Sequence, residues 1–86
     1  MANKALPVSF KTIETSKEME QLGKRIKELR KRKGYTSYET FANEHDIHRV
    51  QWGRYEKGKD LYFSTIIKIT RILDVSIEEF FREGFE

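Results

Sequence analysis

Residues 48–56 would place side chains suited to reading DNA on one side of a short helix. At about 100° per residue, Trp52 and Tyr55 fall together and form an apolar face. The opposite side carries two arginines, a valine and a glycine, namely Arg49, Val50, Gly53 and Arg54. Arginine bonds guanine O6 and N7 in bidentate fashion, valine contacts a thymine methyl group, and glycine lets a backbone approach closely. The pattern favours a major-groove reading surface; the alternative is an ordinary amphipathic helix whose arginines only solvate it.

The charge of the chain is unevenly distributed along the sequence. The net charge is +3, yet residues 24–33 contain seven Lys and Arg against a single Glu. Residues 74–86 reverse this balance, with five acids and one Arg. A basic patch on a small domain is typical of a nucleic-acid footprint, although a solvated helix face is the alternative. We expect DNA at the basic segment and a partner subunit at the acidic end.

Composition excludes several classes of protein. The chain of 86 residues has room for one core, and without cysteine it has no disulfide framework, thiol nucleophile or thiolate zinc site. No apolar run approaches the roughly 20 residues that span a bilayer, and the N-terminus lacks the apolar core of a signal peptide. We therefore expect a folded cytoplasmic module without a membrane partner.

Metal binding, cofactors and catalysis are not predicted. His45 and His48 are the only histidines, which are too few ligands for a metal site. Glu78 and Glu79 are adjacent and point to different sides of a helix, an arrangement unsuited to paired acid–base carboxylates. There is no glycine-rich phosphate loop or nucleophile constellation. We expect a protein that is not an enzyme and that uses no cofactor.

The elements that position the reading face are expected to be five short helices joined by tight turns. Capping-box spacing predicts three helix starts, at Thr15 with Glu18, at Thr36 with Glu39, and at Ser76 with Glu79. The first helix should end at Gly34, the second at about Glu44, and the third should span residues 48–56. A fourth, marked by Ile66, Ile69 and Leu73, should follow a loop at 59–62 and continue to Asp74.

Residues 16–82 form the predicted domain, with an N-terminal extension over 1–15 and a C-terminal tail over 83–86. In the extension, Leu6, Val8 and Phe10 alternate with Pro7 and Ser9. This period of two indicates either a short edge strand or an irregular arm, because proline is tolerated only on an edge strand.

Residues 36–56 have the proportions of a helix-turn-helix. Four blocks in order, at residues 22–30 (LGKRIKELR), 33–36 (KGYT), 54–58 (RYEKG) and 72–81 (ILDVSIEEFF), resemble the phage-repressor/Cro-like (Xre-type) helix-turn-helix proteins. The resemblance covers residues 22–81. It implies an all-α, five-helix, repressor-like DNA-binding domain whose third helix reads the bases.

The resemblance also implies roles for individual residues. The base-contacting positions of the family match Arg49, Val50 and Arg54, with His48 and Gln51 beside them and Gly53 on the same face. The phosphate-contacting positions match the start of the second helix, the start of the third and the loop after it, namely Thr36, Ser37, Tyr38, His48, Lys57 and Lys59. Arg30 and Glu56 match a pair that bridges the first helix to the end of the third, and Arg30 is also within possible reach of a phosphate.

Five positions depart from the family pattern. Asp46 stands where glycine is usual in the turn, and His48 replaces the Ser or Thr that usually begins the reading helix. His45, Trp52 and Tyr62 replace a core Leu, a smaller Ile or Val, and a small capping residue. Aspartate tolerates the left-handed conformation, so we expect the turn to form, whereas histidine is not one of the residues that favour the N-cap position of the third helix.

Apolar residues at both ends exceed what one small core needs. The dimer candidates are Phe80, Phe81 and Phe85, although a core role for Phe80 or Phe81 is the alternative. A homodimer would read half-sites roughly 34 Å apart in a near-palindromic double-stranded operator. We expect a prokaryotic or phage transcriptional regulator of repressor type. The alternative is an antitoxin-like or adaptor module that binds a protein partner and for which DNA binding is secondary.

Overall fold

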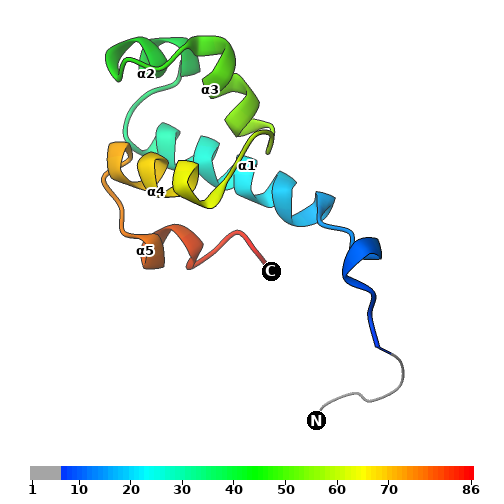
Figure 1. The fold of residues 1–86 in the computed structure, drawn as a ribbon. Coiled ribbons are helices and arrows are strands. Elements are labelled where there is room, and N and C mark those ends of the chain that lie inside the picture. Colours follow the sequence, from blue (N-terminus) through cyan, green and yellow to red (C-terminus); the bar gives the residue numbers. More distant parts are fainter. Residues whose placement is uncertain (1–6) are drawn as a thin grey trace.

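The computed structural model describes residues 7–86, which form five α-helices and one short 3₁₀ turn (Figure 1). The helices are α1 (Ser16–Arg32), α2 (Tyr38–Glu44), α3 (Arg49–Glu56), α4 (Phe63–Ile72) and α5 (Ile77–Phe81). Figure 1 shows α2 and α3 on one side of the long α1 and α5 on the other. The prediction of an all-α, five-helix domain is confirmed.

The described part of the N-terminal extension, residues 7–15, leads away from the helices (Figure 1). Residues 7–15 contain no strand; a 3₁₀ turn, η1 (Phe10–Thr12), forms instead. The amide and hydroxyl of Thr12 both donate to the carbonyl oxygen of Ser9, each over 3.1 Å, which closes this turn. Over the described part of the extension, the edge-strand alternative is therefore wrong. Leu6, the first residue of the alternating pattern, lies outside the described residues.

The helix starts follow the sequence pattern with two differences. The hydroxyl of Ser76 accepts from the amide of Glu79 over 2.9 Å, which confirms the predicted cap of α5. The cap of α2 is Ser37, which accepts from the Thr40 amide over 3.2 Å, so the predicted cap at Thr36 is wrong by one residue. Thr15 precedes α1, but its hydroxyl caps no amide. Its φ of −124° and ψ of 5° depart from the extended conformation that points a capping side chain at the first turn.

The turns between the helices contain residues with a left-handed backbone conformation. Gly34 has φ 100° immediately after α1, as predicted for the end of that helix. Asp46 has φ 58° between α2 and α3, so aspartate does adopt the conformation that the turn requires. Asp60 and Asp74 adopt the same conformation, both with φ 60°. Aspartate thus takes a glycine-like role in three connections of this chain.

The core gathers apolar residues from all five helices. Its buried members are Ile26, Leu29, Phe41, Ala42, Trp52, Ile66, Ile69, Leu73 and Phe80. The ring of Phe41 lies 4.9 Å from that of Trp52 and 4.2 Å from that of His45, measured between centroids. Trp52 and His45, two departures from the family pattern, therefore fill the space between α2 and α3 together. Such contacts add to the stabilisation from burial alone.

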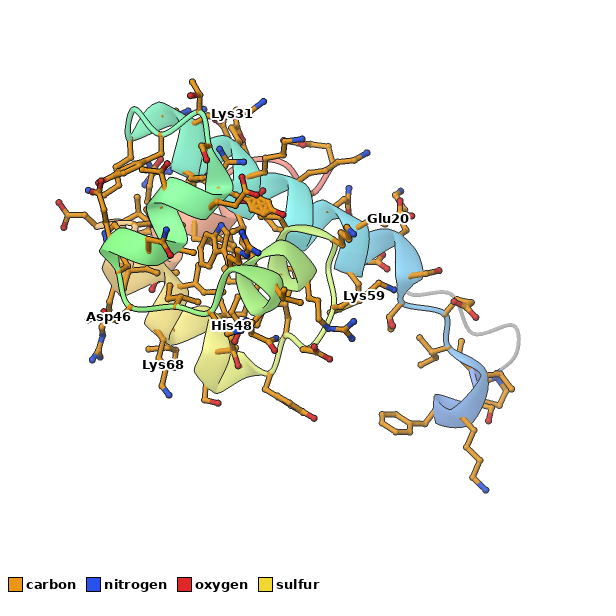
Figure 2. The ribbon with its side chains drawn as sticks, turned by 90° about the horizontal axis from the view of Figure 1, so that it is seen from above. Glu20, Lys31, Asp46, His48, Lys59 and Lys68 are labelled. Atoms are coloured by element: carbon orange, nitrogen blue, oxygen red, sulfur yellow. The ribbon has the colours of Figure 1, made fainter. Side chains whose placement is uncertain are left out.

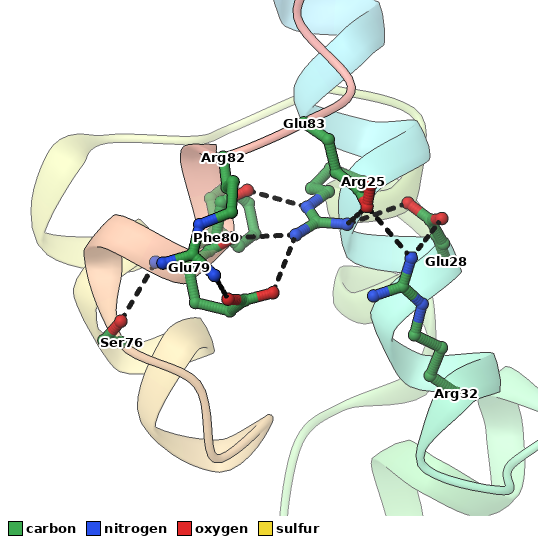
Figure 3. A network of polar contacts seen from close by, with 8 residues as sticks. All are labelled: Arg25, Glu28, Arg32, Ser76, Glu79, Phe80, Arg82 and Glu83. Carbon is green, nitrogen blue, oxygen red and sulfur yellow. Dashed lines mark hydrogen bonds and ion pairs between the residues drawn. The ribbon is translucent and has the colours of Figure 1, made fainter.

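A buried arginine fastens α5 to α1 (Figure 3). Arg25 is 1% exposed, and its Nε and Nη2 each donate to a carbonyl oxygen of α5, those of Phe80 and Glu79, over 2.7 Å. Cations are favoured at helix C-termini, where carbonyl groups lack helical partners. Arg25 thus satisfies the end of a five-residue helix that could not persist alone.

Acidic side chains surround this arginine and its neighbour Arg32. Nη1 of Arg25 lies 3.0 Å from Glu28 Oε1, and Arg32 Nη2 lies 2.9 Å from Glu28 Oε2 and 3.2 Å from Glu83 Oε2. The hydrogen bond to Glu83 and the charge of Glu28 raise the pKa of Arg32. The expectation of one basic segment facing DNA is therefore wrong for these two arginines. Glu28 of α1, together with the C-terminal acids Glu79 and Glu83, neutralises them within the chain.

On its other side, α1 approaches the end of α3 so closely that the contact is backbone to backbone. A Cβ at Gly23 would lie 2.5 Å from the carbonyl oxygen of Glu56 and 2.6 Å from the amide nitrogen of Gly58. Gly58 itself has φ 79°, and a Cβ there would collide with the carbonyl oxygen of Met19. Only glycine at both positions permits this approach.

Gly23→Ala should therefore destabilise the domain, although alanine is the better helix former. Forcing α1 and α3 apart should lower the free energy of unfolding by about 1–3 kcal/mol, measured by urea denaturation. Gly53→Ala is the matched control, because a Cβ there would meet the Tyr38 ring at an ordinary 3.6 Å. That variant should match the parent or gain up to about 1 kcal/mol. Equal stability of both variants would contradict the close approach.

Candidate nucleic-acid interface

The orientation of α3 is set by its buried face. Trp52 is fully buried, and Tyr55, half-buried, packs edge-on against it with ring centroids 5.9 Å apart. The predicted apolar face therefore packs inward, and Arg49, Val50 and Arg54 are exposed on the other side. Val50 is 59% exposed, which is unusual for a valine and leaves its methyl groups free to contact a ligand.

A buried ion pair holds the end of α3 against α1. Nε and Nη2 of Arg30 lie 2.7 and 2.9 Å from the two carboxylate oxygens of Glu56, and Nε1 of Trp52 donates to Oε2 of Glu56 over 2.7 Å. Nη1 of Arg30 donates to the Tyr35 carbonyl oxygen over 2.8 Å. Arg30 is 3% exposed with this set of bonds, so it has no surface left for the phosphate contact considered from the sequence. Its place is between the helices.

A polar groove of about 510 Å³ runs beside this pair, between α1 and the outward face of α3. Its lining comprises Lys27, Arg30, Tyr38, Val50, Gly53, Arg54, Glu56 and Lys57. Lys27 and Lys57 are exposed and carry no ion pair within residues 7–86, so their charges are available to an anion. The sequence interpretation included Lys27 only as a member of the basic segment 24–33 and did not single it out, although its spacing of four from Gly23 and three from Arg30 places it on the α3-facing side of α1.

Gly53 serves packing as well as access. The ring of Tyr38, from the first turn of α2, lies over it at a distance that would leave a Cβ in van der Waals contact. Tyr38 therefore covers part of the backbone that the sequence interpretation left open for DNA. Gly53 is half-buried as a result.

An aspartate in the loop after α3 binds two of the predicted base readers. Oδ2 of Asp60 accepts from Nε of Arg54 over 2.5 Å and from Nε2 of Gln51 over 3.2 Å, and Oδ1 accepts from Nη2 of Arg54 over 3.3 Å. The hydrogen bond from Arg54 holds the pKa of Asp60 below its ordinary value, and the same contact raises the pKa of Arg54. The sequence interpretation missed Asp60, for which the only signal was one acid beside Lys57 and Lys59.

The remaining predicted contacts lie at the two ends of α3. Figure 2 shows His48 at the beginning of the helix and Lys59 in the loop that follows it, and both are exposed. His48 occupies the cap position, but its side chain makes no capping hydrogen bond, in line with the low preference of histidine for this position. Thr36 and Ser37 precede α2, and the Ser37 hydroxyl is engaged as the cap.

A profile of the Cro/C1-type helix-turn-helix DNA-binding domain matches residues 25–82, more than half of the chain. The chain belongs to this family. The match includes the turn between α2 and α3 and all of α3, so the suspected relationship to phage repressors and Cro proteins is confirmed. Comparisons with curated proteins and with solved structures gave no significant match.

In this Cro/C1-type domain the three C-terminal phenylalanines have different surroundings. Phe80 is fully buried, so it is a core residue and offers no surface to a partner. Phe81 is 40% exposed, and its ring lies 5.2 Å from that of the half-buried Phe85. Of the dimer candidates, only Phe81 and Phe85 present apolar surface.

Residues 7–86 contain no cluster of three or more metal-ligating side chains. None of the helices in this part of the Cro/C1-type domain is both long enough and apolar enough to cross a membrane.

Glu56→Gln should destabilise the domain strongly. The side chains of Arg30 and Glu56 are only 4% and 9% exposed, and removing one partner leaves the other charge buried without compensation. The free energy of unfolding should fall by roughly 3 kcal/mol in urea denaturation. Asp60→Asn is the control, because it removes a carboxylate from an exposed pair and should change stability little. A Glu56→Gln variant as stable as this control would show that the pair does not hold α3.

Proposed function

We propose that the protein is a prokaryotic or phage transcriptional regulator of repressor type that binds double-stranded DNA sequence-specifically with α3 in the major groove. The observation that carries the proposal is the division of α3 between a buried aromatic face and an outward face of Arg49, Val50, Gln51 and Arg54. That outward face adjoins a groove lined by two exposed lysines, Lys27 and Lys57, which form no ion pair with any residue in the described range 7–86. Such a regulator acts in the cytoplasm, needs no cofactor and catalyses no reaction.

The proposed contacts fall into two groups. Arg49, Val50 and Arg54 read base edges, with Gln51 beside them, because arginine, valine and glutamine each match a major-groove pattern. Phosphate contacts come from exposed lysines and from the start of α2 and α3, namely Lys27, Lys57, Lys59, His48, Thr36, Ser37 and Tyr38. Phosphate contacts fix the register on DNA but carry no sequence information.

The direct test is selection of bound sequences from a random duplex pool. Enrichment of one motif, repeated with inverted symmetry, supports a sequence-specific regulator. Recovery of unenriched sequences contradicts it, and the interaction-module alternative then gains weight.

Arg49→Ala and Lys57→Ala should separate base reading from phosphate binding. On the selected site Arg49→Ala should lose about tenfold in affinity, with little loss on an unrelated duplex. Lys57→Ala should weaken both duplexes equally and reduce the slope of log affinity against log salt by about one. Fluorescence anisotropy over a salt series measures both effects. Arg82→Ala removes a positive charge on the α5 side of the molecule and should change neither. Equal losses on both duplexes for Arg49→Ala would refute its role as a reader.

We also propose a homodimer on a near-palindromic operator, with Phe81 and Phe85 in its interface. Ile77 is 41% exposed in the same short helix as Phe81, so α5 offers an apolar patch with the two phenylalanines. This patch is on the opposite side of α1 from α3 (Figure 1), so it leaves the reading face free.

The dimer should be visible by sedimentation velocity at tens of micromolar protein. Phe81→Glu places a charge in the patch and should shift the population to monomer while the helical circular dichroism persists. A parent protein that stays monomeric with and without DNA, or a Phe81→Glu dimer, would contradict this interface.

A further inference from the structure

Asp60 places a carboxylate on the proposed reading surface, where the partner would be a polyanion. It accepts hydrogen bonds from Arg54 and Gln51, which project from successive turns of α3. An acid at this position repels phosphates and lowers the affinity for any DNA sequence. Because Asp60 lowers the affinity for DNA, we ask whether its contact with Arg54 has a benefit, either for folding or for recognition.

The contact between Asp60 and Arg54 contributes little to the stability of the fold. The side chains of Arg54 and Asp60 are 47% and 43% exposed, and exposed ion pairs add little to folding. The backbone of Asp60 lies in the left-handed region at φ 60°, which glycine adopts at less cost.

The geometry of the Arg54 guanidinium shows what the carboxylate does. Asp60 occupies one edge of the group, because Nε and Nη2 donate to its two oxygens. The second hydrogen of Nη2 and one hydrogen of Nη1 point in parallel along the Nη1/Nη2 edge, and no hydrogen bond within residues 7–86 uses Nη1. Guanine O6 and N7 accept two parallel N–H bonds, which is the pattern that the remaining edge presents.

We propose that Asp60 is a specificity-determining positioning residue that aims the Nη1/Nη2 edge of Arg54 at a guanine. Held in this way, the guanidinium has a fixed orientation and a partner for its charge, so it is a poor ligand for a phosphate and a good one for a base edge. Asp60 thereby lowers binding to random DNA more than binding to the operator. The inference rests on the proposed function, because it requires α3 to enter the major groove.

The test compares the base preferences of variants, again by selection from a random duplex pool. The parent should enrich a guanine at one position of each half-site, and Arg54→Ala should lose it. Asp60→Asn, which keeps the side-chain shape and tolerates the backbone conformation, should lose about tenfold in preference at that same position. Its affinity for an unrelated duplex should be equal to or higher than that of the parent. Asp60→Gly relieves the backbone and should give the same change, which separates the carboxylate from any effect on folding.

Asp74→Asn is the matched control. Asp74 has the same φ of 60° and is exposed, but it lies between α4 and α5, away from the reading face. The substitution removes the same charge and should leave the preference unchanged. In an Arg54→Ala background, Asp60→Asn should have no further effect on that position, because Asp60 acts through Arg54.

The outcomes distinguish the two levels of the proposal. If the parent enriches no motif, the proposed function fails and this inference fails with it. If the parent enriches a motif and folded Asp60→Asn keeps the full preference at the Arg54-dependent position, the regulator stands and the role of Asp60 is refuted. Tighter binding to all sequences with unchanged preferences also refutes it, because Asp60 would then be only a repulsive charge.

Discussion

The ion pair between Arg30 and Glu56 is the contact on which the interface depends. It joins residues 26 apart in sequence, and the second donor to Glu56 is the indole of Trp52. Because Trp52 is the buried centre of α3, one carboxylate fixes both the position of the helix end and its rotation. No buried side-chain nitrogen or oxygen within residues 7–86 lacks a hydrogen-bond partner. A fully satisfied polar group of this kind specifies one arrangement, whereas an apolar contact would allow α3 to slide or rotate.

The same helix that supplies Arg30 divides the charge of the protein. Gly23, Lys27 and Arg30 follow a spacing of four and three along α1 and face α3. A second series, Arg25, Glu28 and Arg32, follows a spacing of three and four and faces α5 and the tail. A basic run that looks uniform in sequence is therefore two surfaces, one open to an anion and one closed by acids of the same chain. The C-terminal acids Glu79 and Glu83 form ion pairs with Arg25 and Arg32 of the same chain. The acidic charge of this region is therefore no longer a reason to expect a partner subunit there.

The sequence predicted the features that depend on local pattern. Ser76 with Glu79 and the opposed faces of α3 follow from short spacings, and the left-handed Asp46 follows from the residue type at a turn; the structure has each of them. The capping-box pattern favours Thr36, which has Glu39 three residues later, yet Ser37 is the cap. Between two neighbouring hydroxyls this pattern alone does not identify the cap.

Features that depend on contacts between distant segments of the chain could not be predicted from the sequence. Helical spacing places Arg25 next to the apolar face of Leu22, Ile26 and Leu29, but its full burial requires α5, which ends beside it, and the sequence does not show that contact. Asp60 meets Arg54 because the loop after α3 turns back through a left-handed residue. Phe80 and Phe81 are adjacent, yet one is in the core and the other half-exposed, a difference set by the docking angle of α5.

The central claim is that the side of α3 opposite Trp52 is the surface that meets DNA. The most direct measurement is backbone and arginine side-chain NMR during titration with the selected duplex. The account predicts that the largest chemical-shift changes occur at Arg49, Val50 and Arg54, with smaller ones at Lys27 and Lys57. The amide resonances of α5 should not shift. Shifts concentrated in α5 or in the N-terminal extension, with α3 unchanged, would contradict it.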